Sequence, residues 1–392
     1  MPQHRSSLTL LVACTFGLLG CAGSRHHQAP YAPRQDASAA QQRALDLAAR
    51  GYPGAAHQAD PAGQPLATVS QQWVVKGDPL PVTLLTPVGG SASLPLLVYL
   101  PGLGESAQAG AHWRYAWARA GYAVLSFQAL EGDANAWSSA LARQADFKAL
   151  ALQHSQAPLL TARLRMLEGV LAEARLRAAS GDAPWARVDL DRLAVIGYDL
   201  GAATAMVWGA RLTPIAAGQA RAVIMLSPAG LSRMQAEPLL ASMPPRLPLL
   251  AINSRRAADL TGVLDSAAER TRFFDAVPAN SNKSLLLLNS PSHAALAGAA
   301  GMAESPNEPA SQRGIKGAAS RSSHGPGQHQ AVMSAAPPPL LLDKGNQEAG
   351  VAIEHISIAF LNQHLRANPQ AASWLQQSAA TWLAGLGDWQ QR

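Results

Sequence analysis

The amino-acid sequence predicts an α/β fold with a mostly parallel central sheet flanked by helices. Short apolar runs such as Leu94 to Leu100 and Leu193 to Ile196 alternate with longer amphipathic stretches, which is the pattern of βαβ units. The 392 residues are 48% hydrophobic and 14% charged, so they can bury a sizeable core. The sequence shows no repeat with the period of a solenoid protein.

The first residues have the pattern of an export signal. His4 and Arg5 precede an uncharged apolar run from Leu8 to Gly20. This run is short for a bilayer-spanning helix, which needs about 20 apolar residues. We therefore expect residues 1–20 to be a signal peptide that is removed.

The apolar run ends Leu18-Leu19-Gly20-Cys21, which resembles the lipobox of bacterial lipoproteins. The alternative is an ordinary cleavage site beside an incidental cysteine. The resemblance implies that Cys21 is acylated, becomes the new N-terminus and anchors the chain to a membrane of the cell envelope. Ala22 at the next position favours the outer membrane, on the side that faces the periplasm.

Composition and cysteine usage exclude several classes of site. Cys14 is the only other cysteine and lies in the segment expected to be removed, which excludes cysteine catalysis and cysteine-ligated zinc in the remaining chain. Lysine and arginine exceed aspartate and glutamate by 31 to 25 without forming a basic block, so nucleic-acid binding is not expected. His26 and His27 lack partners at ligand spacing, and we expect no metal and no cofactor.

Residues 21–65 and residues 66–392 differ in composition. The first range is rich in Ala, Gln, His, Pro and Gly, and we expect it to be a flexible tether behind the lipid. The second range is expected to form the folded domain. Its predicted strands are Gln72 to Lys76, Val82 to Thr86, Leu94 to Leu100, Ala123 to Phe127, Leu193 to Ile196, Ala222 to Leu226, Leu249 to Asn253 and Ser284 to Asn289.

The remaining elements are helices and one irregular insertion. Predicted helices are Ala111 to Ala120, Pro158 to Ala179, Ala202 to Arg211, Ala352 to Arg366 and a last one near Ala371 to Leu386. Residues 301–346 are rich in Ser, Gly, Pro, Gln and His, and we expect them to be a disordered insertion within the domain.

The strongest chemical signal follows the predicted strand Leu193 to Ile196. That strand runs into Gly197-Tyr198-Asp199-Leu200-Gly201 and then into small helix-forming residues. This is the layout of a nucleophile elbow, in which glycines on both sides allow a strained turn to raise the central side chain above the sheet. The alternative is an ordinary strand, turn and helix with Asp199 as the helix cap.

Two further segments favour the elbow. The strand Leu94 to Leu100 leads into a glycine-rich turn, whose Leu103 amide, together with the Leu200 amide, could stabilise a developing oxyanion. His293 follows the last predicted strand, where it could serve as a catalytic base, although an isolated histidine is usually an ordinary surface residue. The order of elbow and late histidine favours a catalytic role.

From about Leu94 to His293, and again in the closing helix, the chain resembles the predicted dienelactone hydrolase group of the α/β-hydrolases. It is also similar to bacterial relatives of platelet-activating-factor acetylhydrolase. The resemblance rests on Leu97 to Gly104, His112 to Val124, Val188 to Leu193 and Phe274 to Pro278. It implies an α/β-hydrolase fold that hydrolyses esters and lactones with a Ser-His-Asp triad, in which Asp199 holds the serine position and His293 the histidine position.

The chain departs from this family at two catalytic positions. The nucleophile position holds an aspartate, and the acid position after the strand ending at Asn253 holds Ser254-Arg255-Arg256. Asp259 is the nearest candidate for the triad acid, with Asp265 a few residues later. The remaining alternative is that His293 has no acid partner at all. Pro101 also stands where the family usually has histidine.

A carboxylate is ionised near neutral pH and needs no base before it attacks, so His293 would act in the second step, on water. Haloalkane dehalogenases and epoxide hydrolases use aspartate in this way, but Leu200 stands where the former have tryptophan. The cap tyrosines of the latter have no counterpart between Leu226 and Leu249. We expect a membrane-anchored hydrolase of small ester-like substrates. The alternatives are a catalytically inactive hydrolase fold used for binding or scaffolding, and a transport or assembly component unrelated to hydrolysis.

Overall fold

The computed structural model describes residues 33–58, 65–90, 92–181, 183–211, 220–230, 248–277, 282–298, 329–333 and 346–392. The predicted signal peptide and the predicted lipid site at Cys21 lie outside these ranges. In the part of the chain that the structure describes, no helix is long and apolar enough to cross a membrane.

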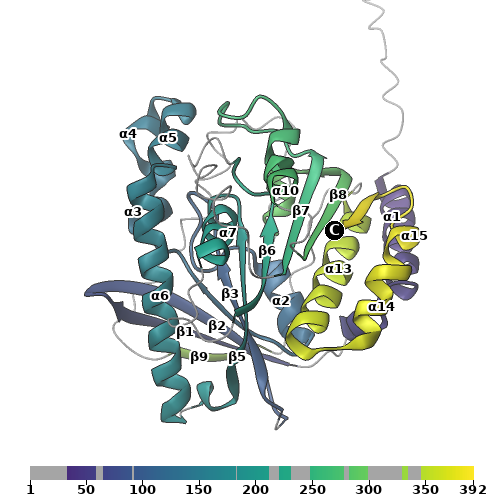
Figure 1. The fold of residues 1–392 in the computed structure, drawn as a ribbon, viewed down its shortest axis with the longest axis horizontal. Coiled ribbons are helices and arrows are strands. Elements are labelled where there is room, and N and C mark those ends of the chain that lie inside the picture. The colour runs from purple at the N-terminus through teal and green to yellow at the C-terminus, as the bar shows by residue number, and fades with distance from the viewer. Residues whose placement is uncertain are drawn as a thin grey trace, which may run out of the picture.

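The described residues form a single ten-stranded sheet with helices on both faces (Figure 1). The strand order is β10-β8-β7-β6-β5-β3-β4-β2-β1-β9. The strands are β1 (Leu66–Val75), β2 (Asp78–Pro87), β3 (Leu94–Leu100), β4 (Ala123–Phe127), β5 (Val188–Tyr198), β6 (Ala220–Leu226), β7 (Leu249–Arg256), β8 (Lys283–Ser292), β9 (His329–Met333) and β10 (Gly387–Gln391).

The direction of the strands confirms the predicted α/β class with a mostly parallel centre. The six neighbouring strands from β8 to β4 are paired in parallel, and their registers are continuous apart from local bulges. The outer strands β2, β1, β9 and β10 are antiparallel to their neighbours. Parallel strands need crossover connections, and their carboxyl ends meet at one edge of the sheet, where α/β proteins place their ligands.

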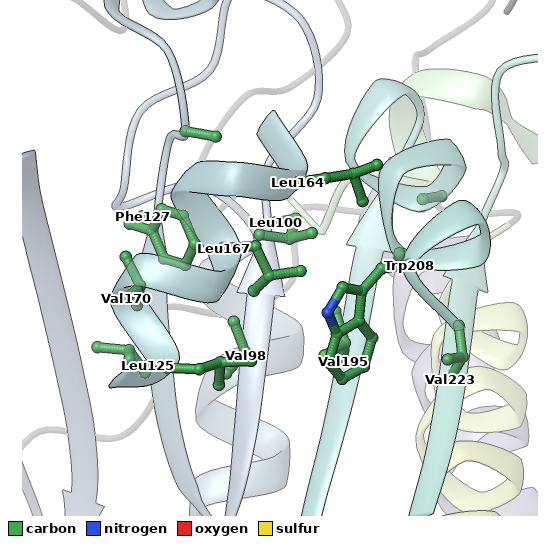
Figure 2. Close-up of a cluster of buried hydrophobic side chains, with 14 of the residues drawn as sticks. Val98, Leu100, Leu125, Phe127, Leu164, Leu167, Val170, Val195, Trp208 and Val223 are labelled. Carbon is green, nitrogen blue, oxygen red and sulfur yellow. The ribbon is translucent and has the colours of Figure 1, made fainter. Parts of the chain in front are cut away.

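One face of the sheet is covered by α6 (Ala157–Ser180) and α7 (Leu200–Arg211). Figure 2 shows Leu164, Leu167 and Val170 of α6 above the strands, with Trp208 of α7 beside them. Strand residues such as Val98 and Val195 complete this fully buried cluster. Helix α6 has a proline in its first turn and is followed by Gly181 in the left-handed conformation, which are typical start and stop signals.

The other face is covered by α2 (Ala111–Arg119) and α13 (Gln347–Arg366), the latter flanked by α14 (Pro369–Gln377) and α15 (Ala379–Trp382) (Figure 1). Alternate strand residues such as Leu97 and Ile196 point to this face, because successive side chains of a strand lie on opposite sides of the sheet. Trp113 and Trp117 of α2 are completely buried there. The core is therefore continuous on both faces of the central strands.

Shorter helical segments connect the main elements. They are α3 (Glu131–Ala134), η2 (Ala136–Ser138), α4 (Ala140–Arg143), α5 (Phe147–His154), η3 (Trp185–Arg187), η4 (Ala267–Thr271), α10 (Arg272–Ala276) and α11 (His293–Leu296). Four of them lie between β4 and α6 and were not predicted as separate elements, because runs of three to eight residues show too little periodicity.

The structure corrects the predicted tether over residues 33–58. This range forms the helix α1 (Pro33–Ala49) and the short helix η1 (Pro53–Gln58), which pack against α13. Ala40, Ala44 and Leu47 of α1 are buried at helical spacing. Alanine side chains are small, so the composition of this range alone indicates too little apolar surface for a core. In the structure, α13 supplies the apolar surface against which α1 and η1 pack.

Two strands near the C-terminus differ from the expectation. The predicted insertion 301–346 lies mostly outside the described residues, but within it β9 pairs with the edge strand β1. The predicted last helix, near Ala371 to Leu386, is divided into α14 and α15, and the chain then returns as β10 beside β8. Trp374 and Trp382 pack against the core on the α2 and α13 face of the sheet and contact each other, with 5.3 Å between their ring centroids.

Candidate active site

The candidate site lies at the carboxyl edge of the parallel strands. Asp199 directly follows β5, Ser227 follows β6, Asn253 lies near the end of β7 and His293 follows β8. Because the four strands are neighbours in the order β8-β7-β6-β5, these side chains converge although almost one hundred residues separate the first from the last. This is the edge at which the sequence predicts an active site.

Asp199 lies in the turn between β5 and α7 with a φ angle of 46°. This left-handed conformation is rare for a residue with a side chain and is a form of stored strain. The two glycines of the motif are required by close contacts. A Cβ on Gly197 would lie 2.3 Å from the Gly201 carbonyl carbon, and one on Gly201 would lie 2.1 Å from the carbonyl oxygen of Leu100.

Backbone hydrogen bonds hold Asp199 in this conformation. Its N–H donates to the carbonyl of Leu226 at 3.1 Å, and its own carbonyl accepts from the amides of Ala203 and Ala229, each at 3.1 Å. The residue is buried, with 6% of its surface exposed, and stands at the N-terminus of α7, where a negative charge is favoured. The turn is therefore fixed by both neighbouring elements.

His293 lies beside Asp199. Its Nε2 atom is 3.7 Å from Asp199 Oδ1. The imidazole stacks on the ring of Tyr198 with centroids 4.9 Å apart, and the Tyr198 hydroxyl donates to the His293 carbonyl at 3.0 Å. The residue before Asp199 thus holds both the ring and the backbone of His293.

Ser227 contacts the other nitrogen of the histidine. Its Oγ lies 2.7 Å from His293 Nδ1, and the serine is completely buried, with a φ angle of 42° at the end of β6. Ser227 is not among the site residues predicted from the sequence. A serine directly after a central parallel strand was the available signal, but serines are common in such turns and nothing nearby marked this one.

Asp259 is engaged within its own loop. Its carboxylate accepts hydrogen bonds from the amides of Thr261, Val263 and Leu264 and from the Thr261 hydroxyl, at distances of 2.7 to 3.0 Å. Its Oδ1 also lies 3.7 Å from Nη2 of Arg270. The contact at Nδ1 of His293 is made by Ser227, so Asp259 as the acid of a triad stays a prediction.

Arg270 is a buried cation of the site that was not predicted from the sequence. Its side chain is 1% exposed and lies between two carboxylates, with Nη1 3.7 Å from Asp199 Oδ1 and Nη2 3.7 Å from Asp259 Oδ1. The guanidinium also donates to the carbonyls of Ala257 at 3.0 Å and Pro228 at 3.2 Å. A buried charge needs such partners. A single arginine in a polar segment gives no sequence signal for this role.

The loop after β3 lies against the elbow. A Cβ on Gly201 would meet the carbonyls of Leu100 and Pro101, so the two backbones are in direct contact there. Leu103 and Leu200, the predicted oxyanion donors, therefore belong to adjacent turns. A backbone hydrogen bond holds the loop after β3 in place: the amide of Gly104 donates to the carbonyl of Asp133 at 2.8 Å.

A cavity of about 10 Å³ opens between these turns. Its wall includes Pro101, Leu200 and Gly201, together with the buried ion pair Asp133–Arg163, whose closest atoms are 2.6 Å apart. A cavity of this size holds about one water molecule.

Glu105 adds a further carboxyl group to the site. Its Oε2 accepts the Gly102 amide at 2.7 Å, across the turn that also holds Leu103. Burial raises the pKa of Glu105 to about 7, an effect opposed by the hydrogen bond from Gly102 and reinforced by the negative charge of Asp199. Glu105 thus differs from Asp199 and Asp259, the two carboxyl groups that lie beside Arg270.

No cluster of three or more histidine, cysteine, aspartate or glutamate side chains within the described ranges could hold a metal ion. Comparisons with known proteins add no identity: the chain matches no model of a protein family and no curated protein sequence.

Proposed function

We propose that the chain is an α/β-hydrolase-fold protein of the cell envelope that hydrolyses small ester-like substrates with Asp199 and His293. The α/β architecture with its parallel centre is compatible with a hydrolase fold. The observation that carries the proposal is a strained aspartate, at a φ angle of 46° on a strand-to-helix turn, with a histidine nitrogen 3.7 Å from its carboxylate.

In the first step of the proposed reaction, a carboxylate oxygen of Asp199 attacks an electrophilic carbon of the substrate. The new carbon–oxygen bond forms while the bond to the leaving oxygen breaks, and the leaving oxygen takes a proton from solvent. Attack at an alkyl carbon leaves an ester on Asp199, whereas attack at a carbonyl leaves a more reactive anhydride. No base is needed in this step, because the carboxylate is already ionised.

In the second step, His293 accepts a proton from water and the resulting hydroxide attacks Cγ of Asp199. The bond from Cγ to the oxygen that carries the substrate fragment breaks, and that fragment takes the proton back from His293. The proton left on the Asp199 carboxyl group is released to solvent, which restores the carboxylate and balances the proton taken up in the first step. Arg270, 3.7 Å from Oδ1, supports the negative charge that develops on the Asp199 oxygens. One water is consumed, and its oxygen remains in the Asp199 carboxylate.

A single turnover in ¹⁸O-labelled water tests this route. The full chain, purified in detergent and in excess over aryl esters, lactones or epoxides, should gain one ¹⁸O atom in the peptide that contains Asp199. Asp199→Asn is the matched control, because it keeps the size of the side chain and removes the nucleophile. Turnover without label would show that water attacks the substrate directly, and no turnover by the wild type on the whole panel would refute the hydrolase.

Asp199→Ser provides a second test, because serine is the residue of the resembling family. If the Leu103 and Leu200 amides can receive an oxyanion, and His293 can act on the new hydroxyl, ester hydrolysis should appear or increase. His293→Ala in that background should abolish the gain. A folded Asp199→Ser protein without activity would indicate that the donors or the base are misplaced.

The second candidate is a catalytically inactive hydrolase fold that serves in binding or scaffolding. Arg270 favours this candidate. Its buried guanidinium lies between Asp199 and Asp259, so Asp199 has a structural role in balancing that charge. In that case Asp199→Asn should lower the free energy of unfolding by about 2 kcal/mol or more, while the wild type hydrolyses none of the panel.

The proposed location follows from the N-terminal sequence. We propose that Cys21 carries the lipid and holds the protein at the outer membrane, facing the periplasm, where its partner is a small-molecule substrate and not a nucleic acid. Cys21→Ser should release the protein from the membrane fraction. Unchanged fractionation, together with an N-terminal wild-type peptide of unmodified mass, would refute the anchor.

A further inference from the structure

The buried polar residues behind His293 form a chain across three strands. Ser227 follows β6, Asn253 lies near the end of β7 and His293 follows β8. Ser227 Oγ is 2.7 Å from His293 Nδ1 and 3.5 Å from Asn253 Oδ1. Ser227 and Asn253 are completely buried, so solvent does not compete for these contacts.

The direction of the hydrogen bonds can be derived from one end of the chain. The backbone amide of Ser254 can only donate, and it donates to Asn253 Oδ1 at 2.8 Å. This contact fixes which end of the Asn253 amide group carries the oxygen. The atom that faces Ser227 is therefore an acceptor.

A serine hydroxyl has a single proton to donate. When Ser227 donates it to Asn253 Oδ1, its lone pairs face His293, and the Nδ1 atom must carry a proton in order to donate to Oγ. In the neutral imidazole the other nitrogen, Nε2, is then the basic one. That nitrogen is the one 3.7 Å from Asp199 Oδ1.

We propose that Ser227 and Asn253 are positioning residues that fix His293 in the tautomer with its proton on Nδ1 and its basic nitrogen toward Asp199. This inference rests on the proposed function for its catalytic meaning, because a base that accepts a proton from water beside Asp199 must present an unprotonated Nε2. Ser227 thereby takes the place at Nδ1 that a triad gives to a carboxylate. A neutral hydroxyl orients the ring without adding charge.

The tautomer is measurable without any substrate. In the full chain, purified in detergent and labelled with ¹⁵N-histidine, the His293 signals are assigned by their loss in His293→Gln. We expect Nε2 to have the chemical shift of an unprotonated nitrogen and Nδ1 that of a protonated one above the pKa of the ring. The reverse pattern would overturn the inference even if hydrolysis is observed.

Ser227→Ala removes the acceptor, and we expect it to give a mixture of tautomers. Ser126→Ala is the matched control, because Ser126 is equally buried on β4 and its Oγ makes no hydrogen bond within the described part of the chain. The control should leave the His293 signals unchanged. A single unchanged tautomer in a folded Ser227→Ala protein would overturn the role of Ser227.

Ser227→Asp is the rescuing variant, since aspartate tolerates a positive φ angle and can accept from Nδ1. It should restore one tautomer and raise the pKa of His293 measured by the same signals. If the wild type is active, Ser227→Ala should lower kcat about 10- to 100-fold and change KM little. Ser227→Asp should recover part of this loss. If hydrolysis is absent but the tautomer responds as described, the proposed function fails and the positioning by Ser227 stands.

Discussion

The carboxyl group of Glu105 should make the stability of the fold depend on pH in a direction opposite to that of an ordinary surface carboxylate. Burial raises its pKa from 4.5 to about 7, against the opposing hydrogen bond from the Gly102 amide and with a reinforcing contribution from Asp199. Between these two pH values the folded chain holds a proton at Glu105 that the unfolded chain has lost. The free energy of unfolding therefore falls as pH rises through this window.

The size of the effect follows from the shift. Each unit of pKa difference corresponds to about 1.4 kcal/mol, so a shift from 4.5 to about 7 corresponds to about 3.5 kcal/mol at full burial. The side chain is partly exposed, and solvent screens its charge. We expect Glu105→Gln, which keeps an oxygen to accept the Gly102 amide, to be more stable than the wild type by about 1 to 3 kcal/mol at pH 8.

Urea denaturation of both proteins at pH values from 4 to 8.5 measures this difference. The variant and the wild type should be similar near pH 4 and diverge steadily above pH 5. Glu131→Gln, at an exposed position of α3, is the control for replacing a carboxylate by an amide. A difference that stays constant with pH, or one in which the variant becomes the less stable protein at pH 8, would refute the reasoning.

Three further predictions concern the core. Leu167→Ala should lower the free energy of unfolding by about 2 to 5 kcal/mol in urea titrations, because Leu167 is fully buried (Figure 2), whereas Leu176→Ala on the exposed side of the same helix should change it by less than about 0.5 kcal/mol. Burial lowers the pKa of His355 to about 4, so the stability it contributes above pH 6.5 should be lost as pH falls toward 4. His355→Gln should reduce the loss between pH 7.5 and 4.5 by about 2 to 3 kcal/mol, and an unchanged loss would contradict the cause. Gly51→Ala should destabilise the protein by about 1 to 3 kcal/mol, because the new Cβ would lie 2.2 Å from His355 Nδ1, and His355→Ala in the same chain should relieve most of this cost in thermal unfolding.

The architecture of the central sheet was predictable from the sequence because its strands are apolar on both faces. Leu94 to Leu100 and Leu193 to Ile196 are nearly continuous hydrophobic runs, and the structure contains both as buried parallel strands. The helix α1 was not predictable in the same way. Its buried residues are mostly alanines, whose pattern differs little from that of a disordered segment, and its stability depends on contact with α13.

The candidate site was predictable where a local motif carries it. Asp199 could be placed on a turn, because the glycines on both sides indicate close backbone contacts that leave no room for a Cβ. Ser227 and Arg270 could not, because they reach the site only through the pairing of β6 and β7 and the fold of the segment after β7. A hydrogen bond between residues 66 positions apart has no signature in the sequence near either residue.

The buried arginine also constrains how this chain can change. Replacing Asp199 by serine removes one of the two carboxylates beside Arg270 and leaves a guanidinium whose charge is balanced by Asp259 alone. The effect of a substitution at position 199 therefore depends on the residue at position 270, a coupling that geneticists call epistasis. A path of change that replaces Asp199 first therefore passes through a less stable protein, in which Asp259 alone balances the charge of Arg270.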